Sequence, residues 1–472
     1  MQMMERFDAY LSRLCEVLAH ADREEPMREY CAGLMLPLKR KSVEPIAAQV
    51  GPEAVSAKHQ SLLHFVGNSA WSDEAMLRSV HDYVMERVPE EGCQGFVLVV
   101  DDTGHPKQGR DSVGVARQYC GMLGKTDNCQ VAVSVSKASA LMSLPLAYRL
   151  YLPQEWVKDA VRRKSAHVPP ELGFATKPQI ALGQLAWVCE QGMALDVQAV
   201  LADSAYGSEY AFRQGIAALG LRYAVEVKHT SKVWGPGQGP LPPARWSGKG
   251  RRPTRWRKNP AQPAQSVKQL ALALPAEAWR VVRWREGTNQ ALQSRFARVR
   301  VTVAHDADQH PPEQEWLLIE WPEAEKAPTK YWLSNLPKSI SMAKLIDTVK
   351  MRWRIERDYQ ELKQEFGLSH YEGRGWRGFH HHATLTIAAY AFLMAERLID
   401  PSSKKNTALR KMPALPKGFR PRGAATRQSP RARLDPDAAP GDRARTRHAP
   451  ASLPVLRETQ SMRSINTTLL TQ

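Results

Sequence analysis

The sequence predicts an α/β protein in which a β-rich insertion interrupts a mixed sheet with flanking helices. A helical N-terminal domain precedes this core, and a disordered basic tail follows it. Three observations support this class. Short apolar runs after residue 95 alternate with amphipathic segments, as expected for a sheet covered by helices. Residues 229–329 change to period-two alternation, and residues 401–472 are rich in Pro, Arg and Ala without periodicity, which predicts strands and disorder respectively. The length of 472 residues is sufficient for two or three domains.

Residues 1–90 predict a separate helical domain, because their apolar residues recur at steps of three and four. Ser72 and Asp73 precede the second strongly periodic stretch and are suited to cap a helix there.

Residues 91–228 predict the first part of the sheet. The run GFVLVVDDTG, 95–104, is apolar until it ends in two acids, as in a strand buried on both faces. The segments that follow read as strands at 129–138 and 141–152, a helix at 177–192, a strand at 197–203, a helix at 209–220 and a strand at 221–227. The order β-β-β-α-β-α-β implies a mixed sheet with helices packed on it.

Residues 229–329 predict the insertion, which opens with a basic Pro/Gly-rich segment. Residues 330–400 then predict the rest of the core: KYWLSNLP, 330–337, resumes the first sheet, and a helix begins near Ser341.

The formal net charge of +18 predicts an anionic partner, most simply a nucleic acid. Residues 401–472 contain 15 Lys/Arg against 4 Asp/Glu, so +11 of this charge lies in the tail. Basicity therefore says little about the folded body. No apolar run approaches the ~18 residues of a membrane span, and no signal-peptide core is evident. We expect a cytoplasmic protein without a membrane partner.

Acidic residues mark the ends of two predicted strands. Asp101 and Asp102 end the first strand and Asp203 ends the fourth, while Glu356 lies on the late helix. If these strands are neighbours, their carboxyl ends bring the acids together. Converging carboxylates suit Mg²⁺ or Mn²⁺, and two such ions support phosphodiester chemistry. The alternative is that each Asp is only a turn former or a helix cap.

Cations flank Glu356 on the late helix. At ~100° per residue, Arg352, Glu356, Tyr359 and Lys363 share one stripe. A simple intrahelical ion pair between Arg352 and Glu356, worth about 0.2–0.5 kcal/mol, is the alternative to a functional role.

Three segments together resemble the DDE transposases of bacterial insertion sequences. VVDDTG, 99–104, is similar to the family's apolar strand that ends in D-x-T, and DSAYG, 203–207, is similar to its D-x-x-[YF]-G block. RWRIERDYQELK, 352–363, matches the R-x3-E-x6-K part of its Y-R-E-K signature, although Val349 stands where that signature has Tyr. The resemblance covers roughly residues 95–398 and implies an RNase H-like catalytic core.

The resemblance also implies roles for single residues. Asp101, Asp203 and Glu356 are the expected metal ligands for two Mg²⁺ or Mn²⁺ ions, with Asp102 kept as the alternative to Asp101. Arg352 and Lys363 are expected to contact the phosphodiester backbone. Residues 1–90 become a candidate domain for binding DNA ends.

Two other groups of residues are secondary candidates. Trp234, Trp246 and Trp256 interleave with cations in the basic loop, where they could stack on unpaired bases or simply lie in a solvated loop. The loop residues that we predict to contact DNA are Arg251, Arg252, Arg255 and Trp256. His380, His381 and His382 point in different directions on a helix, which favours capping or phosphate contact over a shared metal ion.

The expected function is therefore that of a transposase, which cleaves double-stranded DNA at the inverted-repeat ends of its element and joins them to target DNA. We expect a homo-oligomer in the DNA complex, association with the bacterial nucleoid and no nucleotide cofactor, since the Gly-rich segment 107–125 lacks a P-loop order. The alternatives are a catalytically inactive copy that still binds DNA and a glycosidase with paired carboxylates. The cation-rich stripe and the net charge argue against the glycosidase.

Overall fold

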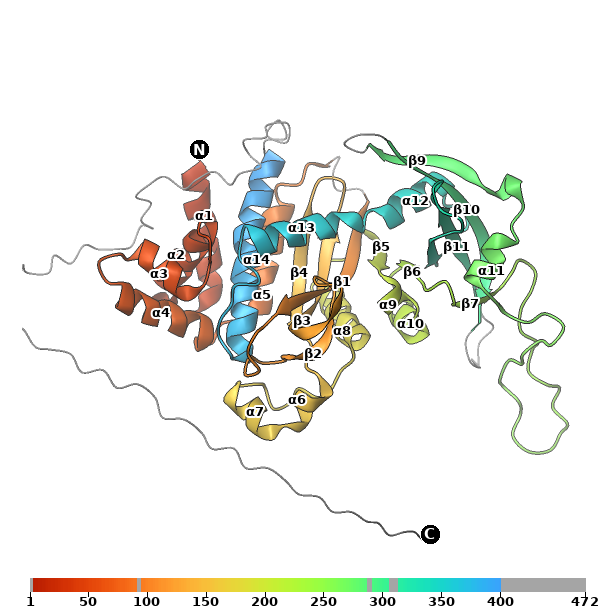
Figure 1. The fold of residues 1–472 in the computed structure, drawn as a ribbon, viewed down its shortest axis with the longest axis horizontal. Coiled ribbons are helices and arrows are strands. Elements are labelled where there is room, and N and C mark those ends of the chain that lie inside the picture. Colours follow the sequence, from red (N-terminus) through yellow and green to blue (C-terminus); the bar gives the residue numbers. More distant parts are fainter. Residues whose placement is uncertain (1–2, 91–94, 287–290, 305–312, 400–472) are drawn as a thin grey trace, which may run out of the picture. The chain divides into compact units, whose positions relative to one another are not determined.

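Two β-sheets and the helices around them form the structure, a computed structural model that describes residues 3–90, 95–286, 291–304 and 313–399 (Figure 1). The predicted tail, 401–472, lies outside the described residues. Within them, no helix is both long enough and apolar enough to span a membrane.

The first sheet is mixed, as predicted. Its strand order is β2-β3-β1-β5, and β4 also pairs with β3. The β1–β3 pairing is antiparallel and the β1–β5 pairing is parallel. The strands are β1 (Phe96–Pro106), β2 (Ala116–Cys120), β3 (Lys125–Ala138), β4 (Ser143–Leu150) and β5 (Val197–Ala202). The sequence analysis missed β2. The mixed α/β class is thus confirmed, while an RNase H-like core stays a prediction.

The helices lie around the two sheets (Figure 1). The N-terminal helices are α1 (Met3–Cys15), α2 (Glu24–Met35), α3 (Val43–Val50), α4 (Val55–Gly67) and α5 (Asp73–Met85). Further along the chain come α6 (Gln154–Lys158), α7 (Ala160–Ser165), α8 (Lys177–Glu190), α9 (Ser204–Gly207), α10 (Tyr210–Ala218), α11 (Val267–Leu272), α12 (Met342–Lys350), α13 (Trp353–Gln364) and α14 (Trp376–Ile399). Short 3₁₀ turns are η1 (Glu16–Leu18), η2 (Ala21–Arg23) and η4 (Ala276–Ala278). Ser72 caps α5 as predicted, since its side chain accepts a hydrogen bond from the backbone N–H of Ala75.

The long helix α14 joins the N-terminal helices to the first sheet. It packs against α5, α2, α4 and β4 (Figure 1), and the buried apolar residues of all these elements form one continuous cluster. Because the N-terminal helices share this core with the first sheet, a separate N-terminal domain remains a prediction.

The three histidines of α14 are buried in this core. His380 accepts a hydrogen bond from the backbone N–H of Leu150, His381 lies 3.1 Å from the carbonyl oxygen of Val66, and His382 lies 2.8 Å from the hydroxyl of Tyr30. Burial lowers the pKa of His380 and His382 to about 4. The predicted phosphate contact is therefore wrong, because these imidazoles are neutral core groups with protein partners. The contact of His381 with the Val66 carbonyl, in the last turn of α4, agrees with the predicted capping.

The second sheet contains the predicted β-rich insertion. Its order is β6-β12-β11-β10-β7-β8, with β9 also paired to β10, and it has a small apolar core of its own. The strands are β6 (Ala224–Glu226), β7 (Lys232–Trp234), β8 (Gln265–Ser266), β9 (Arg280–Glu286), β10 (Ala291–Val303), β11 (Gln314–Trp321) and β12 (Lys330–Ser334).

One sheet prediction is wrong. The segment 330–337 does not resume the first sheet, because β12 pairs with β11 and β6 in the second sheet. The two sheets meet where Val200 of β5 forms a parallel bridge with Tyr223, just before β6.

The late helix predicted from Ser341 is two helices, with a turn at Met351 and Arg352 between them. The sequence has neither Pro nor Gly at this turn. The break instead follows the packing, because α12 contacts β6 and β9 of the second sheet and α13 contacts β3 and β4 of the first.

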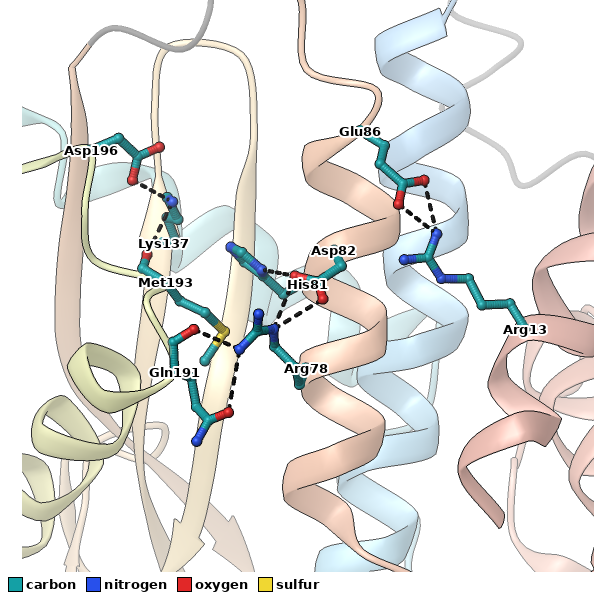
Figure 2. A network of polar contacts seen from close by, with 9 residues as sticks. All are labelled: Arg13, Arg78, His81, Asp82, Glu86, Lys137, Gln191, Met193 and Asp196. Carbon is teal, nitrogen blue, oxygen red and sulfur yellow. Dashed lines mark hydrogen bonds and ion pairs between the residues drawn. The ribbon is translucent and has the colours of Figure 1, made fainter. Parts of the chain in front are cut away.

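A polar network fixes the chain that leads into β5 (Figure 2). Arg78 of α5 donates to the backbone oxygen of Gln191 at 2.6 Å, just after α8. Lys137, at the end of β3, donates to the backbone oxygen of Met193 at 3.1 Å and to Asp196 at 2.6 Å. The Lys137 side chain is 2% exposed. Because Val197 begins β5, these bonds help to set where β5 meets β1.

The Lys137→Met variant tests this role. It removes two hydrogen bonds and leaves the Met193 carbonyl without its donor, so we expect the free energy of unfolding to fall by about 1–3 kcal/mol. Urea denaturation measures the change. Lys125→Met is the matched control, since Lys125 is exposed and pairs with Asp127 on the surface. Equal stability of both variants would show that the buried bonds of Lys137 do not fix this segment.

Candidate active site

The register of β1 and β5 places Asp101 beside Asp203. Their last parallel pair joins Val100 to Ala202, and each aspartate is the next residue along its chain. Neighbouring strands lie about 4.8 Å apart, so the two carboxylates begin from adjacent backbone positions. This is the convergence that the sequence predicts for the first and fourth of its strands.

The sequence predicts that the first strand ends at the two acids, but β1 does not end there. It continues to Pro106 in antiparallel pairing with β3, where Asp101 pairs with Ser134 and Asp102 with Val133. What ends at Val100 is the pairing with β5. The acids therefore lie inside a strand, at the point where one of its two neighbours leaves.

Asp101 and Asp102 have different partners because successive side chains of a strand point to opposite faces. Asp101 lies 3.3 Å from Arg352 Nη2, at the start of α13. Asp102 forms an ion pair with Lys177, the first residue of α8. The sequence does not predict this role of Lys177, because the residues around it contain no signal for Asp102 as a partner 75 residues away.

Asp203 caps the short helix α9. Its Oδ1 accepts hydrogen bonds from the backbone N–H groups of Ala205 at 2.9 Å and Tyr206 at 3.3 Å. The capping alternative raised from the sequence is thus observed for this residue. The motif DSAYG also needs its glycine, because a Cβ on Gly207 would lie 2.2 Å from the backbone oxygen of Glu226. Close approach to β6 therefore explains Gly207.

Arg352 connects two of the acids. Its Nη1 lies 3.7 Å from Glu356 and its Nη2 3.3 Å from Asp101. The Arg352 side chain is 19% exposed, whereas that of Glu356 is 68% exposed. The intrahelical pair considered from the sequence exists, but the same guanidinium also reaches across to β1. Arg352 therefore has a tertiary role that a surface ion pair lacks.

The environment of Asp101 favours its neutral form. Burial raises its pKa to about 6, the negative charges of Asp102 and Asp203 act in the same direction, and Arg352 opposes them. Such crowding of carboxylates is typical of sites that need a cation to neutralise them.

Lys363 lies two turns after Glu356 on α13. Its side chain is half-buried, and burial lowers its pKa. No carboxylate of the described chain lies within ion-pair distance of its Nζ. Lys363 is thus a cation available to an external anion.

The donor atoms suit a hard divalent cation, although they are not gathered around one point. Among the described residues, no three Asp, Glu, His or Cys side chains lie close enough to hold a metal ion together. Asp101 and Asp203 supply adjacent carboxylates, and Glu356 is paired with Arg352. The oxygen donors match what Mg²⁺ and Mn²⁺ prefer, and a three-carboxylate site requires Glu356 to leave Arg352.

The basic loop lies between β7 and β8. Arg251, Arg252 and Arg255 are exposed and Trp256 is half-buried, so all four are accessible. Trp234 is 7% exposed, and its indole N–H donates to the backbone oxygen of Gln262. Stacking of Trp234 on DNA bases, considered from the sequence, is therefore wrong, because this side chain is buried.

Comparison with known proteins agrees with these observations. A family model described as "DDE superfamily endonuclease" matches residues 13–291, which include Asp101, Asp102 and Asp203 and end before α13. The chain is also 34% identical over 202 residues to a protein of Microchaete diplosiphon described as "Probable transposase for insertion sequence element IS701". That match covers 43% of this chain and 48% of the relative, so the chain spans about half the length of that relative. These matches confirm the resemblance found in the sequence.

Since the family model covers more than half of its 472 residues, this chain belongs to the DDE superfamily of endonucleases.

Proposed function

We propose that this protein is a transposase that cleaves DNA at the ends of an insertion sequence and joins them to target DNA. The observation that carries the proposal is the placement of Asp101 beside Asp203, with Arg352 of α13 reaching across to Asp101. The description of the Microchaete diplosiphon relative as a probable transposase supports the same activity.

Asp101, Asp203 and Glu356 are the residues that would hold divalent metal in this proposal, as two Mg²⁺ or Mn²⁺ ions. Bound there, the metal supplies activation of a water and stabilisation of the leaving oxygen in phosphodiester cleavage. Asp101 fits this role better than Asp102, because Asp101 shares its partner Arg352 with Glu356 while Asp102 is paired with Lys177. Before metal binds, Arg352 neutralises part of the carboxylate charge.

The proposed substrate is double-stranded DNA. Arg352 and Lys363 would contact its phosphates near the carboxylates, and the exposed loop cations Arg251, Arg252 and Arg255, with Trp256, would hold DNA farther along. The N-terminal helices are proposed to bind the element ends, in a homo-oligomeric complex on the bacterial nucleoid.

A cleavage assay with element-end DNA and Mg²⁺ tests this function. Asp203→Asn and Glu356→Gln should each lower cleavage by more than the ~10–100-fold typical of outer-shell changes at metal sites, and both should leave end binding nearly intact. Asn still caps a helix, so α9 should remain folded. Glu365→Gln, an exposed carboxylate at the end of α13, is the control and should cleave normally.

Normal cleavage by either Asp203→Asn or Glu356→Gln would refute the assignment of these ligands. If the wild-type protein binds ends but does not cleave with any divalent metal, the catalytically inactive copy is the correct description.

Asp101→Asn and Asp102→Asn distinguish the two neighbouring acids. We expect loss of cleavage for Asp101→Asn, because this side chain lies on the side of Arg352. Asp102→Asn should retain cleavage and lose only its ion pair with Lys177. The measurement is the single-turnover rate of both variants at saturating Mg²⁺, and the opposite ranking would make Asp102 the ligand.

Lys363→Met tests the role of the available cation. If Lys363 contacts a phosphate, the slope of log affinity against log salt should flatten by about one unit. Thermal stability should not fall, since Lys363 has no ion pair with the described residues. Lys330→Met is a suitable control, because Lys330 pairs with Glu226 at 3.5 Å in the second sheet. An unchanged salt slope for Lys363→Met would exclude the phosphate contact.

A further inference from the structure

A cavity of about 680 Å³ lies on the α8 side of the first sheet and is not explained by the proposed function. The start of α5, β4, α8, the segment 169–172 and the start of α14 line it. One of its lining residues, Arg149, pairs with Val133, which in turn pairs with Asp102. Residues paired in this way share a sheet face, so Arg149 lies on the face opposite to Asp101. The cavity is therefore separate from the carboxylate site.

Arg149 and two acids, Asp73 and Glu74, line this cavity without pairing with one another. Arg149 is half-buried, and no residue of the described chain forms a hydrogen bond or an ion pair with its guanidinium. Burial lowers the pKa of Arg149, which reflects the cost of desolvating a charge that lacks a partner. Asp73 and Glu74 line the same cavity but lie beyond ion-pair distance of Arg149. Asp73 already accepts a hydrogen bond from the Thr384 hydroxyl at 2.7 Å, and burial raises its pKa to about 7, so Glu74 is the more available carboxylate. A ligand that binds between Arg149 and Glu74 could accept hydrogen bonds from the arginine and donate hydrogen bonds to the carboxylate.

Two tryptophans supply flat apolar walls. Trp187 of α8 and Trp376 of α14 line the cavity and are half-buried. The Trp376 ring contacts His380 at a tilt of 43°, with 4.3 Å between ring centroids, which helps to hold the indole in place. Indole rings with a free face stack well on planar aromatic ligands.

We propose that this cavity binds a guanine base. Guanine presents its O6 and N7 acceptors on one edge, the pair that an arginine contacts in bidentate fashion. Its N1 and N2 donors lie on another edge, where the carboxylate of Glu74 accepts them. Adenine carries a donor amino group beside N7, so it would oppose Arg149. The carboxylates at the cavity also disfavour a phosphate as the group that enters.

Calorimetric titration of the full-length protein with guanosine and with adenosine tests the proposal. Nucleosides carry no phosphate, so the basic surface of the protein does not contribute, and EDTA in the buffer excludes metal-dependent binding. We expect saturable binding of guanosine, about 10–100-fold tighter than that of adenosine. The absence of a saturable heat of binding, or equal affinity for both nucleosides, would overturn the proposal.

Variants locate the binding to the cavity. Arg149→Leu should abolish the preference for guanosine, and Glu74→Gln, a change at an exposed position, should weaken guanosine binding without a folding defect. Arg117→Leu is the matched control, because Arg117 is an exposed strand arginine on β2 outside the cavity. Unchanged guanosine binding in both cavity variants would refute the site.

The source of the base is distinguished by competition. A DNA duplex with one unpaired guanine should displace guanosine if the natural ligand is a DNA base, and a fully paired duplex should not. Failure of both duplexes to compete supports a free guanine nucleotide as the ligand of the same site. No cleavage is measured, so a negative result here would leave the proposed transposase function unaffected.

Discussion

The parallel pairing of β1 with β5 is the constraint on which the candidate active site depends. It aligns Val100 with Ala202, and this register alone makes Asp101 and Asp203 neighbours. A shift of one residue would turn one of the two carboxylates to the other face of the sheet. The apolar residues 96–100 of β1 and 199–202 of β5 are fully buried, which holds the two strands together. The bonds of Lys137 to the segment before β5 act in the same direction.

Arg352 is the second feature on which the candidate active site depends. The negative charges of Asp102 and Asp203 act on Asp101, and without a cation the fold would have to protonate or separate these carboxylates. The turn between α12 and α13 places Arg352 where it contacts both Asp101 and Glu356. In the proposed function, the same charge would bind a phosphate once metal neutralises the carboxylates. The arrangement thus links the folding of this edge of the sheet to the chemistry proposed for it.

Local sequence patterns predict most strands of the first sheet and place Asp101, Asp102 and Asp203 on or directly after them. Strands buried on both faces, such as β1 and β5, occur in the sequence as apolar runs, and the three motifs are sufficient to indicate the family. Longer-range partners were not predictable in the same way. The residues of β12 contain no local signal that tells whether the strand joins the first or the second sheet. The break between α12 and α13 at Met351 follows from their packing on different sheets. Lys177 and the buried state of Trp234 likewise depend on contacts far along the chain.

The central claim is that Asp101, Asp203 and Glu356 form one metal site at the end of the β1–β5 pairing. Anomalous diffraction from crystals of the protein bound to DNA and Mn²⁺ tests it most directly. The account predicts manganese peaks in contact with Asp101 and Asp203, with Glu356 turned from Arg352 toward the metal. Manganese bound by Asp102 in place of Asp101, or bound without Glu356, would contradict it.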